Sequence, residues 1–427
     1  MRRHLSAITI LSLSLLNAGE FHALGGNSIS MGGAGVASAS GSLAGYYNPA
    51  LLTQTKGVEL SLGVGVGVRE NNIGEQLDTL SNMNLTDVVD RIADNAPKSG
   101  SNSASDVKNI ITAQELLRSI EDKNGISLMP TAHLGVQYDN MAIGLYVTSD
   151  IAVSANIDKS HTDLIVEDNG NYYTYDASTD TYGTTDQESF EQSSLQYALD
   201  NKLTTVKVRG LALTEVPISY AHAFDLPMGE LSVGGSLKLM HGTTYSQTLD
   251  IDSEEATDED SLKENQRDSD NIGVDVGLLF KPAKLSGLRV GLVAKNLNAP
   301  SFDTANGDSM KADLQIRTGV QYALSESFEL AGDLDLTSNK TLIQGYDSQM
   351  IGGGVNFHPV SWFALRAGAM QNLANSNEGL VYTAGVALGL QQFQLDISAQ
   401  MASNTGTYDG EDIPKYAKVN VVLVSKW

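Results

Sequence analysis

The sequence predicts an all-β fold, namely a transmembrane antiparallel β-barrel of about fourteen strands. Three observations carry this prediction: strand-length segments in which apolar and polar residues alternate, links that alternate between short and long, and a leader that is followed by no apolar run of membrane-helix length. In lipid, only helices and closed barrels satisfy every backbone hydrogen-bonding group, so an exported chain without such a helix is either soluble or a barrel. The alternating strands and links favour the barrel.

The chain opens with the layout of a secretory signal peptide, which we assign to residues 1–19. Arginines precede an apolar run at 5–16, and small residues follow at 18–19. A positive region, a short apolar region and small residues in this order are typical of a signal peptide, and the apolar run is too short to cross a bilayer. We expect cleavage near residues 18–20.

A glycine-rich segment follows at residues 20–56. Dense glycines also occur in phosphate-binding loops, but here there is no Gly-Lys-Ser/Thr sequence and no preceding strand, so we reject nucleotide binding. Small residues instead suit a backbone packed into a narrow space, and Asn48–Pro49 predicts a sharp turn.

Two motifs in this segment carry a family resemblance. Met31–Val36 (MGGAGV), followed by Tyr47–Leu51 (YNPAL), resembles the FadL type of outer-membrane hydrophobic-compound transporters and their relatives, which include the barrel-like TraF-type conjugal transfer proteins. The resemblance implies that residues 20–56 are an N-terminal luminal hatch inside a barrel of fourteen strands. The hatch residues that it implies are Gly32, Gly33, Gly35, Asn48, Pro49 and Ala50.

The barrel is assigned to residues 57–427. Phe393, Leu395 and Ile397 fall on the face opposite Asp396, and such a period of two over about ten residues gives the length that a tilted membrane strand needs. The count is even, as in bacterial single-chain barrels. The predicted strands lie near 57–68, 126–138, 141–154, 204–224, 229–248, 271–281, 286–298, 312–324, 327–338, 345–358, 361–373, 378–388, 391–402 and 415–427.

Short links alternate with long ones along the barrel. Asp139–Asn140 and Pro359–Val360 are short, whereas 155–203 and 249–270 are long. Short periplasmic turns that alternate with longer external loops are typical of an outer-membrane barrel. A soluble sandwich has no reason for this alternation.

The link at 250–270 is rich in Asp and Glu. Carboxylate oxygens suit the divalent cations that bridge anionic lipopolysaccharide, although no EF-hand spacing is present. Either that role or a solvated external loop explains the link.

A helical insertion at about 70–125 follows the first strand. Gly74–Ala96 and Ala104–Lys123 have helical spacing, with Pro97 and Gly100 between them. We expect an ordered cap whose apolar stripe either binds a hydrophobic ligand or packs against the barrel mouth or the neighbouring helix. Neither this insertion nor the acidic link matches the transporter pattern.

Charge and composition exclude several classes of function. There are 27 Lys and Arg against 51 Asp and Glu, a net charge of -24, which argues against nucleic acid as a partner. The absence of cysteine excludes disulfides, thiolate metal sites and cysteine nucleophiles. We expect no enzyme, no metal and no cofactor, because the histidines show no spacing typical of a metal site or a catalytic triad. Beyond the leader, these histidines are His22, His133, His161, His222, His241 and His358.

Charged side chains on the lumen face of the strands are expected to form a salt-bridged network. Such a network would either anchor the hatch and tune selectivity or serve only as structural pairing. The residues expected in it are Arg289, Lys295, Arg317, Asp333, Asp335 and Asp396.

Two prolines lie within predicted strands, Pro130 and Pro217. Proline removes a ladder hydrogen bond, so one of them is a candidate for an irregularity in the barrel wall near the hatch. A kink at a strand end or edge, without any role in permeation, is the alternative.

The final strand, 415–427, ends on Trp427, which suits the aromatic girdle at a membrane interface. By family resemblance, Trp427 is a candidate signal for the barrel-assembly machinery. The expected location is the outer membrane of a Gram-negative bacterium, with membrane lipid and lipopolysaccharide as partners.

Three functions are open at this point. The first is passage or binding of a hydrophobic small molecule, as the resemblance implies. The second is a TraF-like conjugal-transfer or envelope-assembly barrel without transport, and a distant third is an outer-membrane hydrolase.

Overall fold

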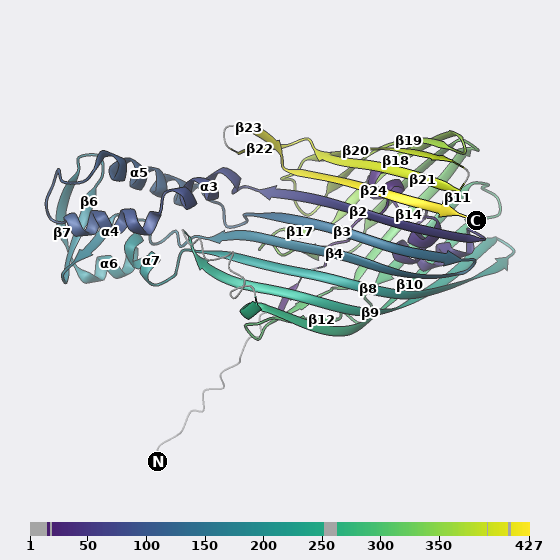
Figure 1. Cartoon of the computed structure of the whole chain (residues 1–427), viewed down its shortest axis with the longest axis horizontal. Helices are drawn as coiled ribbons and strands as arrows, with labels where there is room; N and C mark the ends of the chain where they lie inside the picture. The colour runs from purple at the N-terminus through teal and green to yellow at the C-terminus, as the bar shows by residue number, and fades with distance from the viewer. Residues whose placement is uncertain (1–14, 18, 252–262, 391, 409–410) are drawn as a thin grey trace, which may run out of the picture.

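Fourteen of the described strands close into one barrel, in which every neighbouring pair is antiparallel (Figure 1). The computed structural model describes residues 15–17, 19–251, 263–390, 392–408 and 411–427. Each predicted barrel strand corresponds to one observed strand, so the predicted fold is confirmed. In order around the wall, the strands are β2 (Val58–Asn71), β3 (Gly125–Tyr138), β4 (Met141–Asn156), β8 (Thr205–Leu226), β9 (Gly229–Asp250), β10 (Gln266–Pro282), β11 (Leu288–Lys295), β14 (Gln315–Ser325), β15 (Phe328–Asp335), β18 (Met350–Val360), β19 (Phe363–Asn372), β20 (Leu380–Leu390), β21 (Phe393–Ala402) and β24 (Tyr416–Lys426).

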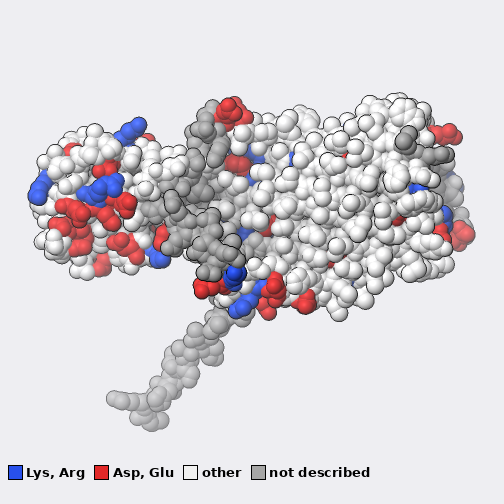
Figure 2. Space-filling model, viewed as in Figure 1, with Lys and Arg blue, Asp and Glu red and all other residues white. Residues whose placement is uncertain are grey.

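The alternation of side chains explains why these segments are barrel strands. On β24, Val419 points outward and is 55% exposed, whereas its neighbours Lys418 and Asn420 point into the lumen and are buried. Figure 2 shows a barrel surface almost free of charge between its two ends. An apolar outer band over a polar interior suits a wall that faces hydrocarbon.

The two ends of the barrel differ in the length of their connections. The turn between β3 and β4 is only Asp139 and Asn140, and Asp139 adopts a left-handed backbone with φ 47°. Figure 1 places β24 and β2 side by side, with Trp427 at this short-turn end. The long links lie at the opposite end, where β8 and β9 run for 22 residues each.

A cap with its own apolar core projects from the long-loop end (Figure 1). The first predicted helix, Gly74–Ala96, is wrong as one element: it is divided into α3 (Gly74–Asn82) and α4 (Leu85–Asn95), because Asn84 adopts a left-handed backbone. The second is confirmed as α5 (Ala104–Ser119), and its apolar stripe packs into the cap core. None of the helices in the described residues is both long enough and apolar enough to cross a bilayer.

The link at 155–203, expected to be a loop, supplies the second half of the cap. Its sheet packs with α4 and α5, and the whole cap shares one buried cluster. Its elements are β5 (Ile165–Asp168), β6 (Asn171–Asp176), β7 (Thr181–Thr185), α6 (Gln187–Ser193) and α7 (Leu195–Asp200).

Smaller elements surround the mouth of the barrel at the same end. At the two ends of the acidic link at 249–270, residues 249–250 pair with β8 and residues 266–270 pair with β9, whereas residues 252–262 lie outside the described part. The smaller strands are β1 (Leu15–Asn17), β12 (Ser301–Asp303), β13 (Ser309–Lys311), β16 (Asn339–Lys340), β17 (Asp347–Ser348), β22 (Thr405–Tyr408) and β23 (Glu411–Pro414).

Candidate functional site

Residues 20–56, the segment that we call the hatch, run through the inside of the barrel and contact its wall on several sides (Figure 1). α1 contacts β20 and β21, η1 contacts β2 and β3, and η2 contacts β8 and β9. The hatch therefore fills the lumen from wall to wall. Its elements are α1 (Gly26–Ser30), η1 (Gly41–Leu43), α2 (Ala44–Tyr47) and η2 (Pro49–Thr53).

The glycines of the MGGAGV motif allow a close approach of two backbones. Gly32 has φ 66°, and a Cβ there would lie 2.4 Å from the carbonyl oxygen of Ala369 and 2.6 Å from the nitrogen of Gly353. Gly33 is also left-handed, with φ 80°, and a Cβ on Gly35 would lie 2.2 Å from the ring of Tyr47. The motif is thus required where the hatch lies directly on β18 and β19.

The YNPAL motif fastens the other end of the hatch. Asn48 is fully buried, and its amide donates to the carbonyl oxygens of Val36 at 2.9 Å and of Leu278 on β10 at 3.0 Å. Its side-chain oxygen accepts from the Ala50 nitrogen at 3.0 Å and so caps η2, where Pro49 takes the first position. One side chain therefore joins two parts of the hatch to the wall.

Of the six lumen charges expected in one network, three act on the hatch. Asp333 accepts from the backbone nitrogens of Gly35 at 2.8 Å and Val36 at 3.0 Å. The Arg317 guanidinium lies 4.1 Å from the centre of the Phe21 ring, and the Lys295 ammonium lies 3.6 Å from that of the Tyr46 ring. These contacts are a charge-assisted anchor and two cation–π pairs.

The other three lumen charges lie in different surroundings. Asp335 pairs with Arg317 at 2.5 Å, and Asp396 pairs at 3.1 Å with Arg366, which was not singled out from the sequence. Arg289 has no ion pair with any residue that the structure describes, and it lines a cavity. The six residues therefore belong to separate groups and do not form one connected network.

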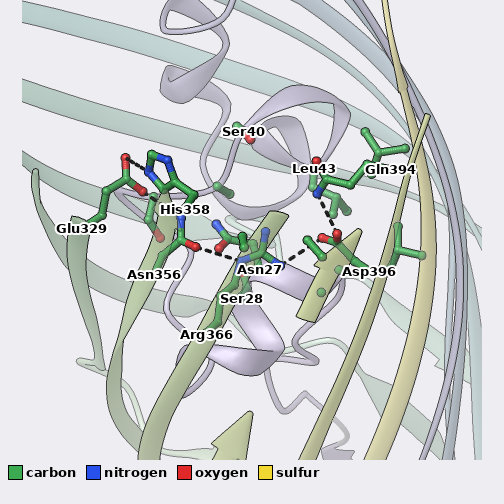
Figure 3. Close-up of a pocket in the computed structure, with 18 of the residues that line it drawn as sticks. Asn27, Ser28, Ser40, Leu43, Glu329, Asn356, His358, Arg366, Gln394 and Asp396 are labelled. Atoms are coloured by element: carbon green, nitrogen blue, oxygen red, sulfur yellow. Dashed lines mark hydrogen bonds and ion pairs between the residues drawn. The ribbon is translucent and has the colours of Figure 1, made fainter. Parts of the chain in front are cut away.

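The cavity beside Arg289, which we call the polar chamber, lies between the hatch and the wall at the short-turn end. It has a volume of about 310 Å³. Figure 3 shows Arg366 between Asn356 and Asp396, with Glu329 beside His358 on the neighbouring strands. The lining is mostly polar.

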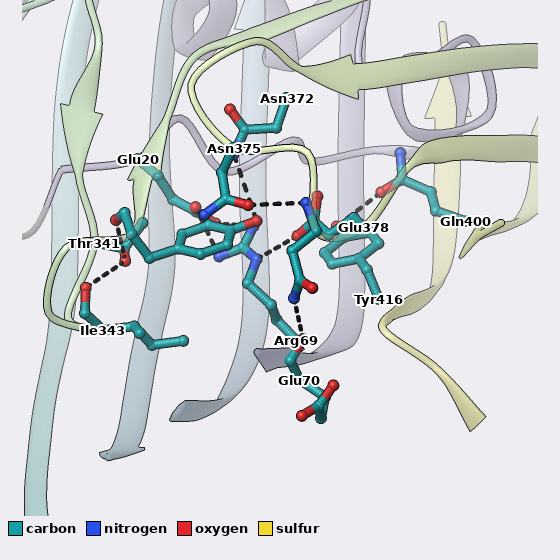
Figure 4. A network of polar contacts seen from close by, with 12 residues as sticks. Glu20, Arg69, Glu70, Thr341, Ile343, Asn372, Asn375, Glu378, Gln400 and Tyr416 are labelled. Atoms are coloured by element: carbon teal, nitrogen blue, oxygen red, sulfur yellow. Dashed lines mark hydrogen bonds and ion pairs between the residues drawn. The ribbon is translucent and has the colours of Figure 1, made fainter. Parts of the chain in front are cut away.

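A second polar group, missed by the sequence reasoning, holds the amino end of the hatch. Arg69 on β2 pairs with Glu20 at 2.9 Å and with Glu378 at 2.6 Å, and the rings of Tyr346 and Tyr416 flank its guanidinium (Figure 4). The signal for Arg69 was its position in the alternation, since it continues the inward face of β2.

His22 extends this group along the wall from β2 to β4. Its Nε2 lies 3.2 Å from Asp150 on β4, and its Nδ1 lies 4.0 Å from Glu20. Glu20, His22 and Asp150 could hold a metal ion, because one ligand atom from each lies within 4.8 Å of the others. However, Arg69 already occupies Glu20, and the two His22 nitrogens face different carboxylates, so the geometry favours a hydrogen-bonded bridge.

Both predicted wall positions interrupt the pairing of one strand, β4. In the β3–β4 ladder, Pro130 and its neighbour have no pair, and the ladder resumes in the same register at Thr131 and Thr148. In the β4–β8 ladder, Pro217 and its neighbour have none. Each proline keeps its partner on the other side, Val66 and Lys238 respectively. Because proline lacks an N–H, β4 has a weakened ladder along both edges.

A row of polar side chains on the lumen wall is buried without partners. Thr131, Gly65, Asn420 and Ser398 are cross-strand neighbours on β3, β2, β24 and β21. Within the described residues, neither hydroxyl of Thr131 and Ser398 nor either end of the Asn420 amide makes a hydrogen bond. We call these residues the seam row, because β2 and β24 are the strands that close the barrel.

Trp427 follows the closing strand. Its backbone exchanges two hydrogen bonds of 3.0 Å with Val58 on β2, and its side chain is 62% exposed. The aromatic ring therefore faces outward at the short-turn end.

The family described as F plasmid transfer operon, TraF, protein matches residues 45–335. The chain belongs to this TraF family. The match runs from the hatch to β15, and it confirms the resemblance to TraF-type barrels that the hatch motifs indicated. Among curated proteins, none matches this TraF chain.

Several solved structures are similar to the TraF chain. The CymD monoaromatic hydrocarbon channel has a TM-score of 0.50 at 13% identity, covering 97% of this chain and 99% of its own, and it shows that the fold is shared. The toluene transporter TbuX of Ralstonia pickettii has a TM-score of 0.47 at 15% identity, with 95% and 98% covered. A FadL homologue of Pseudomonas aeruginosa has a TM-score of 0.45 at 9% identity, with 94% and 97% covered.

Proposed function

We propose that this TraF-family chain is an outer-membrane β-barrel of a Gram-negative bacterium that binds or passes hydrophobic small molecules. The fold shared with a monoaromatic hydrocarbon channel supports this proposal, as do the apolar outer band and the expected leader at residues 1–19. The CymD structure is named as a channel, which supports a role other than catalysis.

The weakened pairing along both edges of β4 is the observation that carries the proposal. An apolar solute would enter from the long-loop end, where Phe302, Met310 and Ile343 belong to a buried apolar cluster. Straight passage would lead through the hatch into the polar chamber, which suits a hydrocarbon poorly. A sideways exit beside β4, where ladder hydrogen bonds are absent, avoids both obstacles.

Toluene uptake into proteoliposomes tests this route. We expect Pro130→Val and Pro217→Val to lower the uptake rate several-fold, because valine restores an N–H to each interrupted ladder. Empty liposomes give the background, and a gel shift on boiling verifies that each variant is folded. Unchanged uptake in both folded variants would contradict the route beside β4. Absence of uptake by the wild type would contradict hydrocarbon passage itself.

A conjugal-transfer or envelope-assembly barrel without transport is the second candidate. The TraF family match favours it, and so does the cap, on which Figure 2 shows many Asp and Glu side chains. Deleting the gene from a donor strain and measuring mating frequency separates the two. If the barrel serves conjugation, we expect the deletion to abolish mating. If transport plays no part in that role, genes for the Pro130→Val and Pro217→Val variants should restore mating fully.

A further inference from the structure

The polar chamber (Figure 3) does not suit a hydrophobic solute, yet it is a cavity with a defined volume and lining. Its volume, about 310 Å³, falls at the lower end of the range for small-ligand pockets. Hatch residues such as Asn27 and Ser40 form part of its lining, and strand residues from β11 around the wall to β24 and β2 form most of the rest. Ser361, in the turn between β18 and β19, places the chamber at the short-turn end.

Most charges that line the chamber are already neutralised. Arg366 pairs with Asp396 at 3.1 Å, and Lys426 pairs with Glu59 at 3.2 Å. Arg289 makes no ion pair or hydrogen bond with the residues described by the structure, although it lines the same space. Glu329, the remaining carboxylate of the lining, accepts from the Asn356 amide at 3.3 Å and lies 3.9 Å from His358. Arg289 is therefore the lining cation left without a partner among the described residues, and its planar guanidinium fits a carboxylate.

Two hydrogen-bond acceptors in the chamber lining are also unused. Gln321 is the direct cross-strand neighbour of Arg289, it is 5% exposed, and its Oε1 has no partner in the described part of the chain. The Oδ1 of Asn27, on the hatch side of the chamber, has none either. A buried acceptor left without a donor costs about 1–3 kcal/mol. A ligand that donates to these oxygens therefore adds hydrogen bonds without breaking an existing one within the protein.

Together these groups define one ligand chemistry. We propose that the polar chamber binds a small hydroxy acid or amino acid, with its carboxylate on Arg289 and its hydroxyl or ammonium donors on Gln321 and Asn27. This assignment goes beyond hydrocarbon passage, because the ligand is polar and enters from the short-turn end.

Three matched probes test the proposal by calorimetry on the purified full chain in detergent. Glycerate carries both the carboxylate and the hydroxyl donors, glycerol has only the donors, and propanoate has only the carboxylate. We expect glycerate to bind at least tenfold more tightly than either of the others, since each removed partner leaves a protein group unpaired.

Three variants assign the contacts. Arg289→Gln should weaken glycerate at least tenfold and leave glycerol unchanged, and Gln321→Leu should weaken glycerate but not propanoate. Lys426→Gln is the matched control, because it removes a cation from the same lining that is already paired and is 56% exposed as a side chain. We expect it to change glycerate binding less than twofold.

Several results of these binding measurements would contradict the proposed ligand. Equal binding by wild type and Arg289→Gln, equal losses in Arg289→Gln and Lys426→Gln, or binding of none of the three probes would overturn the proposal. If Arg289→Gln does not give the folded, heat-modifiable form, Gln321→Leu decides through the comparison of glycerate with propanoate. Toluene uptake is measured separately, so hydrocarbon passage and the chamber ligand succeed or fail independently.

Discussion

Single residues of the lumen wall show which contacts hold the hatch and which do not. The hydroxyl of Ser61 on β2 meets that of Ser42 in the hatch at 2.6 Å, whereas Asn420 in the seam row has no partner among the described residues. The side chains of Ser61 and Asn420 are both nearly fully buried. A buried polar group with a partner stabilises the closed state, and one without a partner destabilises it.

This difference predicts opposite effects of two substitutions. Asn420→Leu should raise the free energy of unfolding by about 1–2 kcal/mol, because it removes two unsatisfied polar ends at nearly constant volume. Ser61→Ala should lower it by about 1 kcal/mol. Urea unfolding from lipid vesicles measures both, and changes of the same sign would contradict the interpretation of the seam row.

Asp333 on the wall accepts hydrogen bonds from two backbone N–H groups of the hatch, at 2.8 Å and 3.0 Å. Asp333→Asn replaces a charge-assisted acceptor, so we expect the hatch to open more often. The chain contains no cysteine, and Ala37→Cys therefore provides one buried label in the hatch. Its reaction with a maleimide should become at least tenfold faster in Asp333→Asn. Glu329→Gln, which alters a lumen carboxylate bonded to the wall, is the control and should leave the rate unchanged.

At the scale of elements, α4 and α5 of the cap are joined by Arg91 and Asp106, whose side chains lie 2.7 Å apart. The hydrogen bonds from Arg91 hold the pKa of Asp106 below its ordinary value. Because the pKa of Asp106 is lower in the folded state, the ion pair stabilises the folded cap above the unfolded pKa, about 3.9. This stabilisation is lost as the pH falls through the folded-state pKa.

Acidification should therefore loosen the cap before the barrel. We expect the protection factors of the α4 and α5 amides, corrected for the intrinsic pH dependence of exchange, to fall below about pH 4 at low salt, and Asp106→Asn to remove that fall. Barrel amides provide the internal control. Protection factors in α4 and α5 that do not change with pH in the wild type would show that the pair contributes nothing.

The elements also show how far sequence reasoning reaches. The inward place of Arg69 and the outward place of Val419 follow from a period of two, which the backbone of a strand imposes. The pairing of Arg69 with Glu20 does not follow, because it depends on the path of the hatch through the lumen. The cap strands could not be read either, since segments such as β7 are polar and exposed and gain their order only by packing on distant helices.

For the whole molecule, closure of the wall is the property that every proposal requires. A closed barrel should resist detergent and migrate differently before and after boiling. Deleting Trp427 should lower the folded fraction in cells severalfold, because the residue pairs with β2 and exposes its ring at the short-turn end. Trp362→Ala, an exposed tryptophan at the same end but within a turn, is the matched control. Equal losses in both variants would argue for a general need for aromatic residues rather than a signal at Trp427.

The pairing of β2 with β24 also has a consequence for the order of assembly. The ribosome makes the hatch before any barrel strand and makes β24 after all the others, yet Gly57, directly after the hatch, lies beside Trp427, directly after β24, at the same seam. The wall cannot become continuous until β24 arrives, and by then a folded hatch must already be enclosed by thirteen strands curved around it. The hatch, the earliest part of the mature barrel to be made, thus serves as the template around which the strands assemble. The final pairing of β24 with β2 encloses the hatch in the lumen.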